Sequence, residues 1–311
     1  MPIIFEGATI SGGISIEPYT PPVSKKAIFG YGSTGTKVSI TNLVSDTGVV
    51  GNDVTGVGSA RSGASAASYG TDKAIFGYGT TGSVTAITNL VSNTGVVATD
   101  TTGVGTARQG LAAAGYGTDK AIFGYGLASG GVVVSVTNLV SNTGVVATDT
   151  SGVGTVRWGL AAAGYGSSGQ AIFGYGANGS FVAVSITNLV SNTGVVGNDV
   201  TGVGTAREGL AAAGYGTDKA IFGFGYGTNF TAITNLVSNT GVVSTDTAGV
   251  GTARANLAAT SYGTDKAIFG YGYGSGGYLS ITNLVSNTGV VSTDTTGVGT
   301  ARNDLAAASY G

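Results

Sequence analysis

The sequence predicts an all-β fold, and two local observations support this. Of the 311 residues, 58 are glycine, which is too many for stable helices, and no window keeps a 3.6-residue apolar period. Short runs of β-branched and small apolar residues alternate with turn signals such as Asn-Thr-Gly and Gly-Thr-Asp. A third observation, an internal repeat, indicates how these strands are organised.

The chain repeats itself six times from residue 26 onward. The segment Ala-Ile-Phe-Gly begins at Ala27, Ala74, Ala121, Ala171, Ala220 and Ala267. The segment Asn-Leu-Val-Ser begins at Asn42, Asn89, Asn138, Asn188, Asn235 and Asn283. Successive copies are therefore about 48 residues apart, a period typical of stacked or radially arranged supersecondary units.

Each copy contains four predicted strands. In the second copy these are residues 74–78, 84–92, 96–99 and 111–116, which we call strands b, c, d and a from their expected order in space. Turn signals separate all four. The most regular piece is residues 111–126, in which strand a, a Gly-Thr-Asp turn and the next strand b form a predicted hairpin.

Four strands per unit of about 48 residues fit the blade of a β-propeller. A β-solenoid is the alternative, but its coils are shorter and it needs a cap at each end. The first copy lacks strand a, and the last residues, 303–311, supply one. We therefore predict a six-bladed β-propeller of four-stranded blades over residues 26–311, closed by the C-terminal strand, which completes the first blade.

Residues 1–25 match no repeat and contain all four prolines of the chain. Residues 3–10 and 13–17 are predicted as short strands, followed by an extended Pro-rich linker. Two interpretations of this arm remain open: it packs on its own chain, or it anchors the chain to another protein or a second copy.

Composition excludes several classes of function. The net charge is −2 and the 13 Lys and Arg residues are evenly spread, so we expect no nucleic-acid partner. The chain has no Cys and no His, which removes thiolate chemistry and the commonest general base, and we expect no cofactor or metal. No run of ~18 apolar residues occurs, and no basic segment precedes an apolar one, so we expect neither membrane insertion nor a signal peptide.

The chain carries Arg-Gln-Gly-Leu-Ala-Ala-Ala at residues 108–114, Lys-Ala-Ile-Phe-Gly-Tyr-Gly at 120–126 and Thr-Asn-Leu-Val at 137–140, and this pattern resembles the kelch repeat. The resemblance covers residues 26–311 and implies blades with strand a innermost, followed outward by b, c and d. Two features depart from the family pattern. Gly77 and Gly79 are separated by Tyr78, and Val96-Val97 stands where an outer-strand Trp is usual. Because kelch proteins include enzymes, scaffolds and adhesins, the resemblance does not decide the function.

A second resemblance concerns the whole chain. The nearly identical copies and the composition, rich in Gly, Thr, Ser and Asn and free of Cys and His, look like those of bacteriophage virion proteins. This resemblance implies location in a virion, with residues 1–25 contacting other virion proteins or a second copy.

Because neighbouring strands alternate in direction, the a–b and c–d turns are expected on one face of the propeller. We call this the constant face, because these turns barely differ between copies. The b–c loops lie on the opposite, variable face, and they are residues 33–37, 80–84, 127–132, 177–182, 226–230 and 273–278. The residue after each repeat arginine also varies and is expected at the mouth of the axial channel on this face. The predicted ligand-binding residues are Gln109, Trp158, Phe181, Glu208, Tyr226, Phe230, Tyr273 and Tyr278. The alternative is that these loops vary only because loops tolerate change.

Each copy also has one Arg and one Asp. The arginines are Arg61, Arg108, Arg157, Arg207, Arg254 and Arg302, and the aspartates are Asp53, Asp100, Asp149, Asp199, Asp246 and Asp294. Six arginines around an axis suit an anion site, but we predict that they form structural ion pairs or bind backbone carbonyls. Asp46, Asn52 and Asp53 form the nearest approach to a calcium loop, and they lack its spacing.

These observations predict a non-enzymatic virion structural, decoration or tail-fibre-type protein. Residues 1–25 would anchor it, and the variable face would bind a host-surface glycan or a protein. The alternative is a free carbohydrate-binding lectin. A glycan-cleaving enzyme is the third hypothesis, with Glu208 as its best candidate, but among the variable positions only Asp46 and Asp304 add further carboxylates and no acid/base pair is evident.

Overall fold

The computed structural model describes residues 24–311. The strands predicted in residues 3–10 and 13–17, and the contacts of residues 1–23 of the arm, lie outside this range. The described chain is all-β, as predicted, and forms seven small antiparallel sheets. Its only helical element within residues 24–311 is the single turn η1, Ser129–Gly131.

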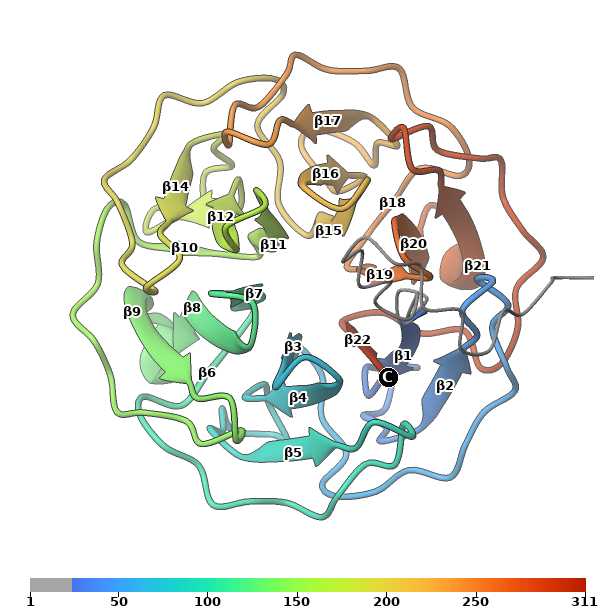
Figure 1. Ribbon diagram of the computed structural model, residues 1–311, viewed down its shortest axis with the longest axis horizontal. Coiled ribbons are helices and arrows are strands. Elements are labelled where there is room, and N and C mark those ends of the chain that lie inside the picture. The colour runs from blue at the N-terminus through green and yellow to red at the C-terminus, as the bar shows by residue number, and fades with distance from the viewer. Residues whose placement is uncertain (1–23) are drawn as a thin grey trace, which may run out of the picture.

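Six units of three antiparallel strands are arranged around a central axis (Figure 1). The strands nearest the axis are β3 (Ser65–Tyr69), β7 (Ala112–Tyr116), β11 (Ala161–Tyr165), β15 (Ala211–Tyr215), β19 (Ala258–Tyr262) and β22 (Ala306–Tyr310). The middle strands are β1 (Lys26–Gly30), β4 (Lys73–Gly77), β8 (Lys120–Ala128), β12 (Gln170–Gly174), β16 (Lys219–Gly223) and β20 (Lys266–Gly274). The outer strands are β2 (Thr41–Val44), β5 (Thr88–Val91), β9 (Val133–Val140), β14 (Thr187–Val190), β17 (Thr234–Val237) and β21 (Gly277–Val285).

Four two-residue strands extend the sheets toward the variable face. They are β6 (Arg108–Gln109), β10 (Arg157–Trp158), β13 (Ala177–Asn178) and β18 (Arg254–Ala255). β6 and β18 pair with the ends of the long strands β8 and β20, and β10 pairs with β13. They connect the repeat arginines to the b–c loops and so build the variable face.

The C-terminal strand belongs to the same sheet as the first described strand, as the sequence predicted. β22 pairs with β1 over five residues, from Lys26↔Tyr310 to Gly30↔Ala306. β2 pairs with the other edge of β1. The chain therefore brings residues from its two described ends into one sheet, and that sheet stands beside those of the second and sixth copies (Figure 1).

The prediction of a regular fourth strand is wrong. Residues 96–99 form no strand. The chain after β5 pairs with that strand only at isolated bridges, which involve Val97 and Thr101. Between the two bridges the side chain of Asn89 donates a hydrogen bond to the Ala98 carbonyl, at 2.9 Å. The amide side chain takes the place of a backbone partner, so the chain bends around it and a continuous ladder cannot form.

The core lies between neighbouring units, where aromatic rings of one sheet pack on the next. The Tyr78 ring meets the Phe123 ring edge-on, with centroids 5.1 Å apart. This packing explains the glycine that ends the Ala-Ile-Phe-Gly segment, because a Cβ at Gly77 would lie 2.8 Å from the Phe123 ring. The same Tyr or Phe to Phe contact recurs between all six pairs of neighbouring units.

Candidate functional site

The two variable sets of residues on the variable face meet in every unit. The residue after each arginine pairs with the first residue of a b–c loop, and the pairs are Asn303–Ser33, Ser62–Thr80, Gln109–Leu127, Trp158–Ala177, Glu208–Tyr226 and Ala255–Tyr273. For Glu208 and Tyr226 both backbone hydrogen bonds of the bridge measure 2.8 Å. The sequence differences therefore gather in one place on a constant scaffold.

A cavity of about 560 Å³ opens among these residues. Six of the eight predicted binding residues line it, namely Gln109, Trp158, Glu208, Tyr226, Phe230 and Tyr273. Phe181 and Tyr278 are not part of its lining, but each packs against a residue that is, Phe181 against Trp158 and Tyr278 against Tyr273. A volume of this size lies within the range of ~300–1,000 Å³ found for small-molecule sites.

A closed ring of backbone hydrogen bonds forms part of this lining. Its members are Gly63, Gly110, Gly159, Gly209, Asn256 and Asp304, and each N–H donates to the carbonyl of the preceding member at 2.6–2.9 Å. The Gly63 N–H donates to the Asp304 carbonyl and closes the ring. All six residues have φ between +51° and +62°, a conformation that Gly adopts freely and that Asn and Asp tolerate best among the others.

Aromatic rings occupy one side of the cavity mouth. The rings of Tyr226 and Phe230 have centroids 5.2 Å apart, and Phe230 lies 6.1 Å from Tyr273. Tyr273 continues to Tyr278 at 5.3 Å, so two neighbouring units contribute a run of four rings. Tyr226 is 41% exposed and Tyr273 39%, so their ring surfaces are available to a ligand.

The polar groups of the cavity are incompletely satisfied. Trp158 Nε1 and Glu208 Oε2 are buried without a hydrogen-bond partner. No charged or hydrogen-bonding neighbour among residues 24–311 offsets the burial of the Glu208 or Asp304 carboxylate. Burial raises the pKa of Glu208, and it raises the pKa of Asp304 to about 6. No Lys or Arg lies among the described residues of the lining, so neither carboxylate is compensated there.

The sequence did not identify Asn256 as a lining residue of the cavity, and it did not predict that Asp304 belongs to the ring of backbone hydrogen bonds. The position two residues after each arginine is Gly in four copies and Asn or Asp in the other two. This restriction to residues that accept positive φ was the available signal for a tight backbone ring.

The repeat arginines are structural, but direct ion pairs are not their main contacts. Arg108 is fully buried and donates to the carbonyls of Tyr125 and Thr106 and to Asn138 Oδ1, at 2.7, 2.8 and 2.7 Å. Asn138 in turn donates to Asp149 at 2.9 Å. In the described chain only one repeat arginine, Arg61, has an aspartate within 4.0 Å, Asp100 at 3.9 Å.

All six arginines are fully buried, so they offer no anion site on the axis. Each guanidinium also lies over an aromatic ring of the neighbouring unit, as Arg108 does over Tyr78 at 4.2 Å. Burial lowers the pKa of Arg254 to about 10. The ring under this guanidinium is that of Phe224, whereas the other five arginines lie over tyrosine rings. Burial alone would raise the pKa of Asp149, but hydrogen bonds from Thr106 and Asn138 outweigh it and hold that pKa below its usual value.

The calcium loop considered from the sequence is not supported. Asp53 accepts hydrogen bonds from Asn42 and Thr300 and so belongs to the arginine network. The described part of the chain contains no group of three acidic side chains placed to hold a metal ion. It also contains no helix long and apolar enough to cross a membrane.

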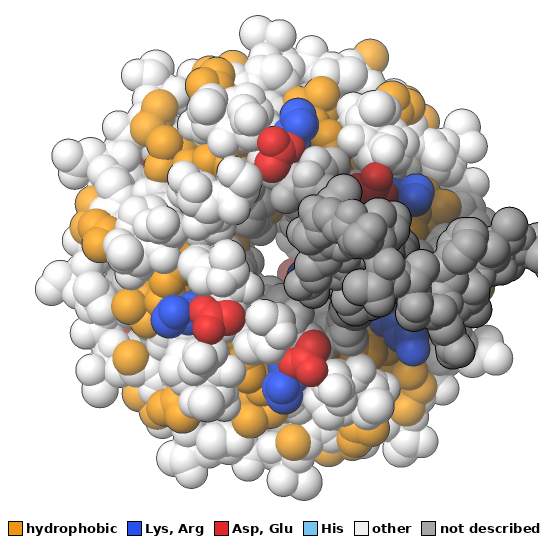
Figure 2. All heavy atoms as spheres, viewed as in Figure 1, with side chains coloured by type: hydrophobic (Ala, Val, Ile, Leu, Met, Phe, Trp, Pro, Cys, Tyr) orange, Lys and Arg blue, Asp and Glu red, His pale blue; other side chains and the backbone are white. Residues whose placement is uncertain are grey.

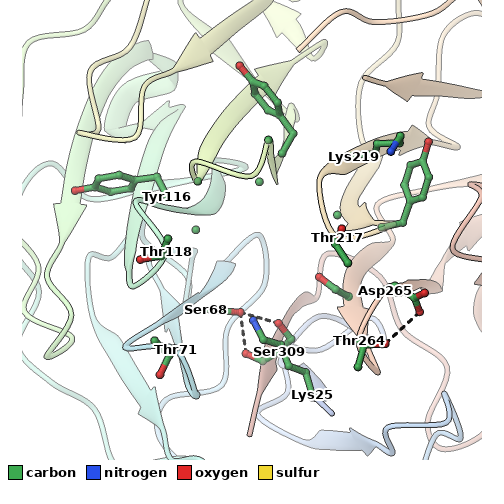
Figure 3. A pocket seen from close by; sticks show the side chains of 18 of the residues that line it. Lys25, Ser68, Thr71, Tyr116, Thr118, Thr217, Lys219, Thr264, Asp265 and Ser309 are labelled. Atoms are coloured by element: carbon green, nitrogen blue, oxygen red, sulfur yellow. Dashed lines mark hydrogen bonds between the residues drawn. The ribbon is translucent and has the colours of Figure 1, made fainter. Parts of the chain in front are cut away.

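The constant face carries a second cavity, of about 580 Å³, lined mainly by Gly, Tyr, Thr and Lys of the a–b turns. Acidic and basic side chains lie in pairs around the central opening (Figure 2), and they include Asp119–Lys120 at 3.0 Å and Asp218–Lys219 at 2.7 Å. The turn threonines Thr71, Thr118, Thr217 and Thr264 surround the cavity (Figure 3). Lys120, Lys219 and Lys266 of its lining are each paired with an aspartate, in contrast to the carboxylates of the cavity on the variable face.

A second set of backbone hydrogen bonds links all six units at the constant face. The glycine that ends each inner strand donates to a turn carbonyl of a neighbouring unit at 2.7–2.8 Å, and the donors are Gly70, Gly117, Gly166, Gly216, Gly263 and Gly311. Gly263 donates to Lys25 and Gly311 to Asp72. Residue 25 and Gly311 therefore both lie on the constant face, opposite the aromatic cavity.

The sequence was also compared with known proteins, to see whether relatives would name this site. No protein-family model matches the chain, and the search of curated proteins gave no match.

Proposed function

We propose that residues 26–311 form a closed six-bladed β-propeller with kelch-like blades, and that its variable face binds a glycan without cleaving it. Three observations support closure: the pairing of β22 with β1 and the two cyclic sets of backbone hydrogen bonds that link all six units. In each set the length of the bond that returns to the start lies within the range of the others, as expected for a ring without a free edge.

The observation that carries the glycan assignment is the composition of the cavity on the variable face. Sugar rings have apolar faces that stack on aromatic side chains, and hydroxyl groups that need amide and carboxylate partners. Trp158, Tyr226 and Phe230 provide the rings, while Gln109 and Asn256 provide amides. The unpartnered N–H of Trp158 would gain an acceptor from a bound hydroxyl group, which favours binding because unmade hydrogen bonds are costly.

We further propose that the protein is a virion structural, decoration or tail-fibre-type component anchored through residues 1–25. Support comes from the virion-like composition and from the position of Lys25 on the constant face, where it bonds to Gly263. An anchor beginning there would leave the aromatic cavity directed away from the particle. Cryo-EM of assembled particles tests this proposal, and particles without density for the chain would refute it while leaving a free lectin as the alternative.

Glycan cleavage is the second candidate function, because two carboxylates with raised pKa values, Glu208 and Asp304, line one cavity. A raised pKa is what a general acid requires. Incubating the full chain with each glycan that it binds, followed by mass spectrometry, separates the two functions. Intact sugar supports binding alone, whereas products that disappear with Glu208→Gln would establish an enzyme.

A glycan array probed with the full chain tests the main proposal. We expect bound glycans, and we expect Trp158→Ala to abolish or strongly reduce their signals because the largest ring of the cavity is lost. Val145→Ala is the matched control, since it removes an exposed apolar side chain from a turn on the constant face. An array without hits, or equal losses in both variants, would contradict glycan binding at this cavity.

A further inference from the structure

The charge of the cavity on the variable face restricts the class of sugar that fits it. Its described lining contains two carboxylates, Glu208 and Asp304, and neither Lys nor Arg. The nearest arginines in sequence are Arg207 and Arg302, and both are fully buried and bonded to backbone carbonyls and to asparagine side chains. They are therefore unavailable as partners for the cavity carboxylates.

The aromatic rings, like the two carboxylates, favour a positively charged ligand. The face of an aromatic ring carries partial negative charge and attracts cations, most strongly when the cation is desolvated. Tyr226, Phe230 and Tyr273 lie on the lining next to one another. An acidic sugar would face two uncompensated carboxylates and several ring faces, so the lining disfavours it.

We propose that the cavity binds a sugar bearing a free, protonated amino group, with Glu208 and Asp304 accepting hydrogen bonds from the ammonium group. This inference rests on the proposed glycan-binding function and specifies its substrate class. The ammonium group supplies hydrogen-bond donors to Glu208, whose Oε2 has no partner, and to Asp304, and the sugar hydroxyls supply an acceptor to Trp158 Nε1. The sugar ring stacks on the aromatic side of the mouth.

Binding of such a cation depends on pH with a defined sign. Because burial raises the pKa of both carboxylates, part of the Asp304 population is neutral near pH 6 in the empty cavity. The remaining titratable side chains of the lining are the phenols of Tyr226 and Tyr273. Affinity should therefore rise as the pH increases from 5 through 6 and Asp304 ionises, and it should fall again at higher pH as the amine of the ligand loses its proton.

The test is calorimetric titration of the full chain with hexaglucosamine and with its N-acetylated hexamer, which is neutral. At pH 6, where the amines of the ligand are protonated, we expect hexaglucosamine to bind at least about tenfold more tightly, because each charge-assisted hydrogen bond contributes that much or more. Glu208→Gln and Asp304→Asn should each remove about tenfold of affinity for hexaglucosamine while changing that for the neutral hexamer little. Asp119→Asn, on the constant face, makes the same change in net charge and should leave the preference intact.

The Asp304 variant is expected to keep the native fold. Asp304→Asn places Asn where the equivalent residue of the neighbouring unit, Asn256, already adopts φ of +53°. Thermal melting of each variant verifies the fold. If the neutral hexamer binds as tightly as hexaglucosamine, or if Asp119→Asn removes the preference equally, the amine inference is wrong although glycan binding stands. If neither hexamer binds, the inference is also wrong, and the array alone then decides the proposed function.

Discussion

Replacing Asn138 with Ala should destabilise the protein more than any exposed substitution, because this side chain connects the buried arginine to the rest of its unit. Asn138 is fully buried and accepts a hydrogen bond from Arg108 Nη2 at 2.7 Å. It donates to the Ala147 carbonyl at 3.0 Å and to Asp149 at 2.9 Å. Alanine removes all three bonds and leaves a buried guanidinium N–H without an acceptor.

The size of the effect follows from these contacts. Removing one partner from a buried charge costs about 3–5 kcal/mol, and the two bonds that Asn138 donates contribute to the upper part of that range. Bending of the chain around the amide also depends on Asn138, so the outer segment should lose its attachment to β9. We expect Asn138→Ala to lower the free energy of unfolding by about 3–5 kcal/mol.

Urea unfolding followed by circular dichroism measures this loss. The matched control is Asn142→Ala, four residues along the same chain segment. Asn142 is exposed and makes one side-chain hydrogen bond, to Asp119 at 3.1 Å, so we expect a change within about 0.5 kcal/mol. A loss below about 1 kcal/mol for Asn138→Ala, or equal losses in the two variants, would refute the account of the arginine network.

Three further predictions concern other parts of the fold. In five units a tyrosine hydroxyl donates to a valine carbonyl, and the fifth copy has Phe224 instead of this tyrosine. Phe224→Tyr should add the missing bond to Val250 and raise the free energy of unfolding by about 1 kcal/mol, and a loss of stability would contradict this. Deleting residues 303–311 removes the strand that pairs with β1 and should lower the melting temperature of the whole domain, whereas unchanged melting would contradict a closed propeller. The folded pKa of Asp304, about 6, exceeds its unfolded value, so its contribution to stability is complete below about pH 4 and is lost as the pH rises through 6. Asp304→Asn should therefore stabilise the protein at pH 7, and the difference in stability between the variant and the original protein should shrink toward pH 4. A difference that stays constant with pH would contradict the burial of this carboxyl.

Much of the architecture was predictable because each copy repeats the same local signals. The hairpin of residues 111–126 combines a small-residue strand, a positive-φ turn and an apolar strand, and the structure forms it as β7 and β8. The place of residues 303–311 followed from counting strands per copy. Recurrence therefore supplied long-range information that a single copy would not contain.

The parts that could not be predicted depend on side chains acting as backbone partners. Nothing local distinguishes Asn89 as a group that prevents regular pairing of residues 96–99, since both segments have the composition of strands. Six of the residues that line the cavity on the variable face were predicted from their variability around a constant scaffold. The contribution of Asn256 was missed, because its role comes from backbone conformation within a ring formed by all six copies.

The central claim, that the cavity on the variable face is a glycan-binding site, can be tested through Trp158. It is the only tryptophan of the chain, and it lines the cavity with its indole N–H unpartnered. Intrinsic fluorescence of the full chain therefore reports on this one site. Titration with a glycan that binds on the array should shift the tryptophan emission, with half-saturation at the dissociation constant measured by calorimetry. Calorimetric binding without any change in the emission of Trp158 would place the ligand elsewhere and contradict the account.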